Sequence, residues 1–295
     1  MAKKNELAVL DTFKLTNPYE GMDPELLAEL EDELADLDEE NGITCRRIKM
    51  PSGGALAFEV QGEDEEDVEY VKELQGVILF THRVNGYWSK ALGDGDGGAA
   101  PDCSSMDGKI GINVTTGECI TCDTCPLNQY GSDAGGGAGK ACKNMRRLYL
   151  MVSGDPNCYL LTVPPTSIKD VNKKLRALLT GGTPYIGMVV SIKLTKETNK
   201  NGVDYAKIVL NKAGLLPPDV VTQAKELRRQ MKGKFMEMSI NAAEYNTPRQ
   251  DPADIFVDDD DLFPARDEQA PPPSDLAPQF EEAPPLPNDD NLPFA

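Results

Sequence analysis

The sequence predicts a mainly β fold with some helix, an α+β arrangement built around an OB-like Greek-key barrel. Several short apolar runs are bounded by turns rich in Gly, Pro and Asn, which indicates strands. One helical pattern, over residues 167–179, lies among these runs. A cysteine-rich loop, residues 103–142, interrupts the strands. Strands followed by a helix and then a hairpin fit an OB-like barrel, which has five strands and often a helix between the third and fourth.

The expected strands lie on both sides of that helix. Before it we expect strands at 44–50, 55–60, 76–88, 147–152 and 158–163, and after it a hairpin of 185–195 with 203–211. Asn85-Gly86 is a strong turn dipeptide, so we expect the strand at 76–88 to fold back there. Thr166 or Ser167 is expected to cap the helix, and Gly181-Gly182 to end it.

Acidic segments bracket a mildly basic middle. The formal net charge of the chain is -19, and residues 20–40 carry eleven acids and no Lys or Arg. Residues 74–245 carry 21 Lys and Arg against 15 Asp and Glu, a net of +6, whereas residues 246–295 have a net of -11. Blocks of like charge usually act as solvated interaction tails. The predicted domains are an acidic arm and helix at 1–43, a binding domain at 44–240 and a disordered Pro-rich acidic tail at 241–295.

The N-terminal arm contains one amphipathic helix. Asp23-Pro24 is expected to open it, since Pro suits a first helical turn. The apolar residues that recur at helical spacing on this acidic segment are Leu26, Leu27, Leu30, Leu34 and Leu37. Two interpretations stay open: a short helix laid on the core, or an acidic mimic that screens a basic site.

The composition indicates a cytoplasmic protein. Hydrophobic residues make up 40% of the chain, enough for a core, but no apolar run approaches the ~20 residues that span a bilayer. The first ten residues are too charged for a signal peptide. Cysteines in a reducing compartment are free thiols, so clustered ones point to a metal before a disulfide.

Five of the seven cysteines lie in the loop at 103–142. Cys122 and Cys125 have the two-residue gap that lets one tight turn present two thiolates to one zinc ion, and Cys103 and Cys142 are available as the other pair. Cys119 and Cys122 have the same gap, so the role of Cys119 stays open. Four thiolates close the tetrahedron, which predicts structural zinc. Cys45 and Cys158 lie in strand-like runs and are expected in the core.

Nothing in the sequence indicates catalysis, and we expect no enzyme. His82 is the one histidine, and no His-x-Glu pattern accompanies the cysteines. The segment 135–140, GGGAGK, lacks the following Ser or Thr and the leading strand of a phosphate-binding loop. The acids lie in loops and tails without the spacing of a metal-dependent nuclease site.

Cations and aromatic residues around the cysteine loop suit a single-stranded nucleic acid, because such proteins combine a basic groove with faces on which bases stack. The residues expected to form this track are Arg83, Tyr87, Trp88, Lys90, Lys140, Lys143, Arg146, Arg147 and Tyr149. Lys173, Lys174 and Arg176 are expected on the solvated face of the helix.

The end of the tail resembles the acidic tip of bacterial single-stranded DNA-binding proteins. Acids precede a Leu-Phe anchor at 258–264 and a Leu-Pro-Phe anchor at 289–295. The resemblance implies recruitment of replication and recombination proteins. The residues it implicates are Asp289, Asp290, Leu292, Pro293 and Phe294. The sequence departs from that tip by adding Ala295 after Phe294.

A second resemblance covers about residues 44–215. PSGGALAFEV, the segment from Asn85 to Trp88, CSSMDG, CDTCPLNQYGS and GKACKNMRRLYL look like zinc-containing proteins of phages and integrative elements. The resemblance implies Cys103, Cys122, Cys125 and Cys142 as zinc ligands, single-stranded DNA as partner and a bacterial host cytoplasm. We therefore expect a single-stranded DNA-binding protein of replication, recombination and repair. The alternative is a zinc-containing adaptor that docks on proteins without binding DNA.

Overall fold

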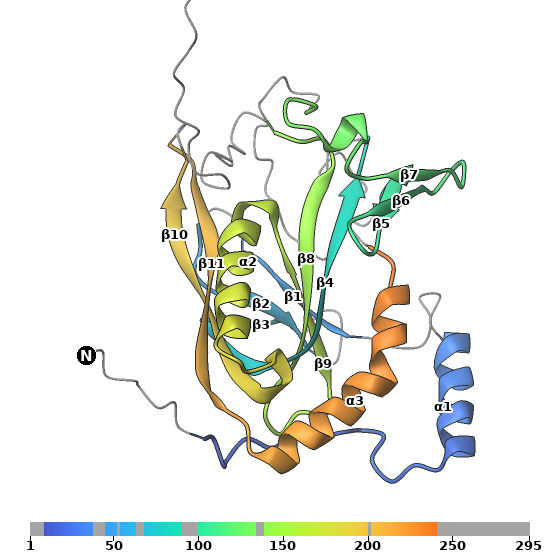
Figure 1. Cartoon of the computed structure of the whole chain (residues 1–295), viewed down its shortest axis with the longest axis vertical. Coiled ribbons are helices and arrows are strands. Elements are labelled where there is room, and N and C mark those ends of the chain that lie inside the picture. Colours follow the sequence, from blue (N-terminus) through green and yellow to red (C-terminus); the bar gives the residue numbers. More distant parts are fainter. Residues whose placement is uncertain are drawn as a thin grey trace, which may run out of the picture. The chain divides into compact units, whose positions relative to one another are not determined.

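The structure, a computed structural model, is a mixed α+β fold that is mostly sheet (Figure 1). It describes residues 9–37, 45–51, 54–62, 68–89, 100–133, 139–199 and 202–240. The strands are β1 (Arg46–Lys49), β2 (Phe58–Gln61), β3 (Val68–Val71), β4 (Glu73–Tyr87), β5 (Cys103–Ser105), β6 (Ile110–Asn113), β7 (Cys119–Thr121), β8 (Lys143–Met151), β9 (Cys158–Val163), β10 (Met188–Thr198) and β11 (Asp204–Leu215). The helices are α1 (Pro24–Leu37), α2 (Pro165–Thr180) and α3 (Pro218–Glu237), with 3-10 turns η1 (Pro126–Asn128) and η2 (Tyr185–Gly187). The predicted α+β class is confirmed.

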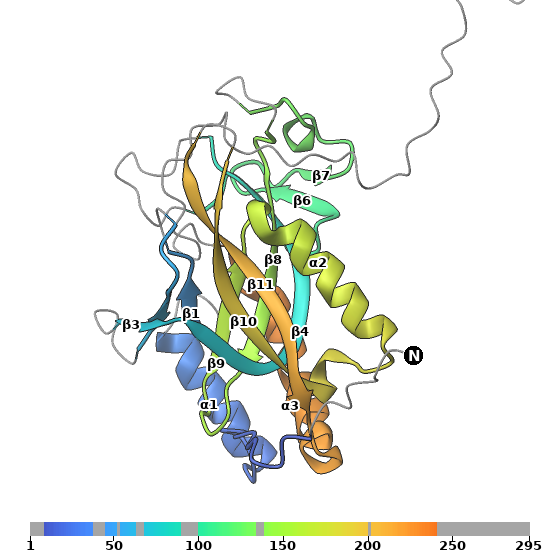
Figure 2. The ribbon, with the colours of Figure 1, turned by 90° about the vertical axis from the view of Figure 1, so that its left-hand side faces the viewer.

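β4 organises the sheet because both of its edges are paired. Its first residues, from Glu73 to Val77, pair with β10, and Val77 to Gly86 pair with β8 across a bulge near Ile78. The run of neighbouring strands is β11-β10-β4-β8-β9-β1-β2-β3, and only the pair of β9 and β1 is parallel. Figure 2 shows β10 and β11 as one long twisted hairpin. β5, β6 and β7 continue from the far end of β4.

The described strands form an open sheet, so the predicted barrel is not confirmed. β9 has β8 on one edge and β1 on the other. Because both edges of β9 are taken, β11 has no place beside it, and among the described residues β11 pairs along its length with β10 alone.

The predicted turn at Asn85-Gly86 is wrong, because β4 continues through both residues. Asn85 and Gly86 pair with Asn144 and Lys143 on one side and with β5 on the other. Sheet pairing on both edges outweighs the local turn preference. The glycine has a packing reason instead, since a Cβ at Gly86 would lie 2.6 Å from the ring of Trp88.

All three α-helices begin with proline, which suits the first turn because its missing N–H has no intrahelical acceptor there. Asp23 caps α1, its carboxylate accepting hydrogen bonds from the backbone N–H of Glu25 and Leu26. α2 begins at Pro165, so the expected cap at Thr166 or Ser167 is wrong. Ser167 is buried and accepts a hydrogen bond from the N–H of Ile208. Gly181 ends α2, as predicted.

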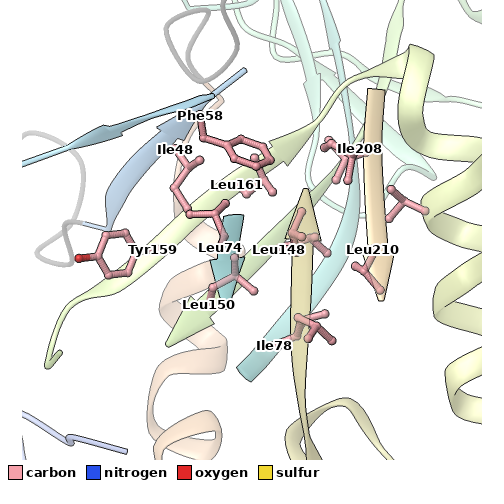
Figure 3. Packing of buried hydrophobic residues seen from close by; sticks show 14 of the residues in the cluster. Ile48, Phe58, Leu74, Ile78, Leu148, Leu150, Tyr159, Leu161, Ile208 and Leu210 are labelled. Atoms are coloured by element: carbon pink, nitrogen blue, oxygen red, sulfur yellow. The ribbon is translucent and has the colours of Figure 1, made fainter. Parts of the chain in front are cut away.

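Two apolar cores lie on opposite faces of the sheet. One contains buried residues of α3 with Val77, Leu79 and Tyr149. The other, seen from close by in Figure 3, contains residues from β1, β2, β4, β8, β9, β10, β11 and α2. Its labelled members are Ile48, Phe58, Leu74, Ile78, Leu148, Leu150, Tyr159, Leu161, Ile208 and Leu210. Cys45 and Cys158 are buried in the first core, as predicted.

The N-terminal segment before α1 also contributes to the first core. Leu10 donates a backbone hydrogen bond to the carbonyl of Leu215, and Phe13 and Leu15 are buried. The predicted domain limits at 43 and 241, Lys90 and the tail residues at 289–294 lie outside the described residues. Within the described part of the chain, no helix is both long and apolar enough to cross a membrane.

Candidate nucleic-acid interface and cysteine cluster

β5, β6 and β7 form a small three-stranded ribbon whose two faces differ. Cys103 pairs with Asn113 and Ile112 pairs with Cys119, so strand alternation puts Cys103, Gly111 and Asn113 on one face. A Cβ at Gly111 would lie 3.1 Å from Cys103 Sγ and 3.6 Å from Cys122 Sγ. Glycine therefore leaves the room that two thiols occupy.

Backbone hydrogen bonds tie the segments that carry the other cysteines to the ribbon and to one another. The N–H of Cys122 donates to the carbonyl of Lys109, and the N–H of Cys125 donates to the carbonyl of Cys122 across a tight turn. Asn128 donates from its side-chain amide to the same Cys122 carbonyl at 2.8 Å. The N–H of Cys142 donates to the carbonyl of Leu127, which ties β8 to this turn.

The four thiols affect one another's pKa values. Burial raises the pKa of Cys142 to about 12, and the thiols of Cys122, Cys103 and Cys125 act in the same direction. Burial raises the pKa of Cys103, and Cys122 and Cys125 add to the effect. All four are free thiols, and the described residues contain no group of three or more Cys, His, Asp or Glu side chains spaced as metal ligands.

Cys119 lies on the other face of the ribbon. It pairs with Ile112 on β6 and is exposed to solvent. The structure thus places Cys119 on the opposite face of the ribbon from Cys103 and Cys122, whose thiols both lie near Gly111.

Arg83 and Arg146 are directly opposite each other on β4 and β8. Burial lowers the pKa of Arg146, and the positive charge of Arg83 acts in the same direction. Arg146 donates to Asn172 Oδ1 on α2 at 2.7 Å and to Thr81 Oγ1 at 3.1 Å. In the part of the chain that the structure describes, no carboxylate forms an ion pair with either guanidinium. A like charge nearby disfavours the charged form of each arginine, and a bound anion would relieve that repulsion.

Tyr87 lies on the same side of β4 as Arg83, because residues two apart along a strand share a face. It is half-buried. The β5–β6 turn also borders this place, since a Cβ at Gly108 would lie 3.0 Å from Arg83 Cβ. One surface beside the cysteine ribbon is therefore formed by Arg83, Arg146 and Tyr87. We call this surface the arginine face.

Arg147 and Tyr149 point to the opposite side of β8 and are fully buried under α3. Arg147 donates to the carbonyls of Met238, at 2.8 Å, and Ser239. The Tyr149 hydroxyl donates to the Phe235 carbonyl at 2.9 Å. Neither side chain is accessible to a ligand here, so their expected place on a nucleic-acid surface is corrected: they anchor the end of α3.

Trp88, Lys140 and Lys143 have contacts elsewhere in the structure. Trp88 packs beside a small apolar cluster that contains Met145. The Lys140 ammonium lies 4.5 Å from the centre of the Tyr130 ring, and Lys143 forms an ion pair with Asp133 at 3.6 Å. The eight predicted track residues that the structure describes therefore do not form one continuous track.

The sequence did not predict the contact between Asn172 of α2 and Arg146. It holds Arg146 in place, and Arg176 follows four residues later on the same helix face. Arg176 is exposed. The spacing of Asn172 and Arg176 was visible in the sequence, but nothing there indicated that this helix face borders β8.

Comparison with protein-family models, curated proteins and solved structures found no match to this chain. The function is therefore argued from the site alone.

Proposed function

We propose that this chain binds single-stranded DNA, with its phosphates on the arginine face. The observation that carries the proposal is the cross-strand pair of Arg83 and Arg146, which has no carboxylate partner among the described residues. Guanidinium groups form paired, charge-assisted hydrogen bonds with phosphate oxygens. Tyr87 on the same strand face offers a ring for one base, as single-strand binders require.

The order of the central strands supports an OB-like arrangement. β4, β8 and β9 are followed by α2 and then by the hairpin of β10 and β11, and β4 lies between β8 and β10. An OB fold likewise places a helix between its third and fourth strands. In this proposal the cysteine loop is an insertion between the first two strands of the OB unit.

We propose a structural zinc ion on Cys103, Cys122, Cys125 and Cys142. The room beside Gly111 and the mutual effect of the thiols on their pKa values support this ligand set. Zinc would lower the pKa values of the thiols. It would also link the ribbon to the start of β8 and so hold the ribbon in place beside the arginine face. Four thiolates leave no open position for water, so no catalytic step is assigned to the metal.

The acidic tail is proposed to recruit replication and recombination proteins. This part rests on the sequence of the Leu-Pro-Phe anchor alone. Acids would steer the tail to a basic partner, and Phe294 would enter an apolar pocket.

Fluorescence anisotropy with a labelled single-stranded oligonucleotide tests the proposal. The wild type should bind with micromolar or tighter affinity at low salt, and Arg83→Gln/Arg146→Gln should weaken binding at least tenfold. The control is Lys193→Gln/Lys196→Gln, which removes the same charge from lysines already paired with Glu73 and Asp204. No binding by the wild type at low salt would instead favour the protein-binding adaptor.

A further inference from the structure

Cys45 and Cys158 lie side by side on two neighbouring strands, and the proposed function uses neither of them. Cys45 directly precedes β1, and Cys158 is the first residue of β9. The parallel register pairs Arg46 with Tyr159, so the residues one position earlier, the two cysteines, also lie opposite each other. Both side chains are buried in the core that contains α3, where Cys45 is 2% and Cys158 is 7% exposed. The two side chains therefore point to the same face of the sheet.

The sulfur atoms of the two cysteines are also close to each other. A hydrogen bond between the two thiols, together with burial, raises the pKa of Cys158. The Cys45 thiol contacts the thioether of Met238 at 4.0 Å, just beyond the end of α3. Both cysteines are free thiols in this structure. Strand register, burial in one core and the bond between the thiols all indicate the same close pair.

The geometry of this pair suits a disulfide bond. A disulfide requires Cα atoms about 4.4–6.8 Å apart, and neighbouring strands of a sheet lie about 4.8 Å apart. Two residues that are opposite each other and share a face are therefore within reach of an S–S bond with little movement of the backbone. The bond needs no partner from elsewhere in the chain.

The position of the pair in the sheet gives such a bond a structural consequence. Among the described strands, β1 links β2 and β3 to the rest of the sheet through β9 alone. Cys45 and Cys158 lie at one end of this junction. A covalent bond there would hold β1 on β9, and it would also restrict the unfolded chain, because a long stretch of sequence separates the two cysteines.

We propose that Cys45 and Cys158 form a reversible disulfide, with a low-molecular-weight disulfide such as oxidised glutathione as the oxidant. One cysteine thiolate attacks a sulfur of oxidised glutathione and releases one glutathione thiolate. The second cysteine thiolate then attacks the chain's own sulfur in the mixed disulfide and releases the other glutathione. The chain loses two electrons and two protons, and one glutathione disulfide becomes two glutathione molecules.

Burial sets the conditions under which this bond forms. Both thiols are shielded from solvent, so the exchange requires the junction of β1 and β9 to open, and it is slow in the folded chain. In a reducing compartment such disulfides are usually transient, so the bond responds to oxidative conditions. The pair acts independently of nucleic-acid binding and of the proposed zinc ion.

Peptide mapping of the full chain tests the bond. The chain is refolded from urea with zinc in equimolar reduced and oxidised glutathione, which gives both thiols access to the oxidant, and is then alkylated and digested with trypsin without reduction. Cys45 and Cys158 fall in the tryptic peptides 15–46 and 148–169, each of which contains a single cysteine. We expect these two peptides to be linked, with a mass two hydrogen atoms below their sum, and dithiothreitol to separate them. Absence of the linked species would overturn the proposal.

Thermal unfolding tests the consequence for the sheet. The midpoint of the oxidised wild type should exceed that of the reduced wild type by about 10 °C. Cys45→Ser should show no such rise, whereas the control Cys119→Ser, which changes an exposed cysteine of the ribbon, should keep it. Melts in reducing buffer identify a serine variant that fails to fold, and Cys45→Ala then replaces it. A rise that persists without Cys45, or a linked chain that melts like the reduced one, would contradict a bond that holds β1 on β9.

Discussion

At the scale of single residues, position on a strand decides what each side chain does. Arg146 and Arg147 are neighbours in sequence, yet one lies on the arginine face and the other is buried against the end of α3. The alternation of side chains along β8 separates them. The sequence could not tell which face is open, because the covering residue Met238 lies 91 positions later.

Gly111 should be required to retain the proposed zinc ion. In Gly111→Ala the new Cβ meets Cys103 Sγ at 3.1 Å, so the thiols must move apart. We expect zinc to be released to a colorimetric chelator at least tenfold faster than from the wild type. Gly233→Ala is the control, since its site on α3 is open and alanine favours helix. Equal release from Gly111→Ala and the wild type would argue against a metal at these thiols.

His82 should make stability depend on pH. Burial lowers its pKa to about 4, and the charges of Arg147 and Arg146 act in the same direction. The unfolded chain binds this proton near the usual pKa of about 6.5, so stability is complete above pH ~6.5 and is lost as pH falls toward 4. The loss amounts to at most about 3 kcal/mol.

We would measure urea unfolding of the wild type and of His82→Gln between pH 7 and 4. The comparison separates the contribution of His82 to stability from the contributions of the carboxylates. The difference in unfolding free energy between the two proteins should shrink or reverse as pH falls. A single histidine also gives an unambiguous NMR titration. A His82 pKa above 6 would contradict the buried position.

At the scale of elements, α3 is held by side chains that cap its last carbonyls. Arg147 donates to Met238 and Ser239, and Tyr149 donates to Phe235. A positive charge is also favourable beside the negative end of the helix dipole. α3 covers the face of the sheet opposite to the arginine face.

Arg147→Met should therefore loosen the end of α3. Two carbonyls lose a charged donor, which we expect to lower the free energy of unfolding by about 3 kcal/mol. Amide hydrogen exchange should quicken over residues 235–240 before the rest of the helix. Arg229→Met, which changes an exposed arginine paired with Glu226, should leave the free energy of unfolding almost unchanged. Unchanged exchange at the helix end would remove Arg147 from this role.

Element identity was largely visible in the sequence, whereas strand partners were not. Apolar periodicity located α1 and α2, and apolar runs bounded by turns located β9, β10 and β11, close to their observed limits. Asn85-Gly86 misled because a local turn preference cannot report pairing on both edges of β4. The same limit applies to the barrel, since nothing in the sequence of β1 indicated that it would pair with β9.

At the scale of the whole molecule, opposite charges are separated along the chain. The acidic segment 246–295 has a net of -11, and the middle 74–245 has a net of +6. Deleting residues 246–295 should strengthen oligonucleotide binding at low salt, because a competing polyanion is removed. The gain should disappear at high salt, where charges are screened. Unchanged affinity at low salt would rule out competition by the tail.

The salt dependence of DNA affinity tests the arginine face most directly. Each phosphate contact contributes about 0.7 to the slope of log affinity against log salt for a single strand. Arg83→Gln/Arg146→Gln should lower that slope by about 1.4, whereas Lys193→Gln/Lys196→Gln should leave it unchanged. An unaltered slope in the arginine variant, or an equal loss in the lysine control, would contradict phosphate binding at this site.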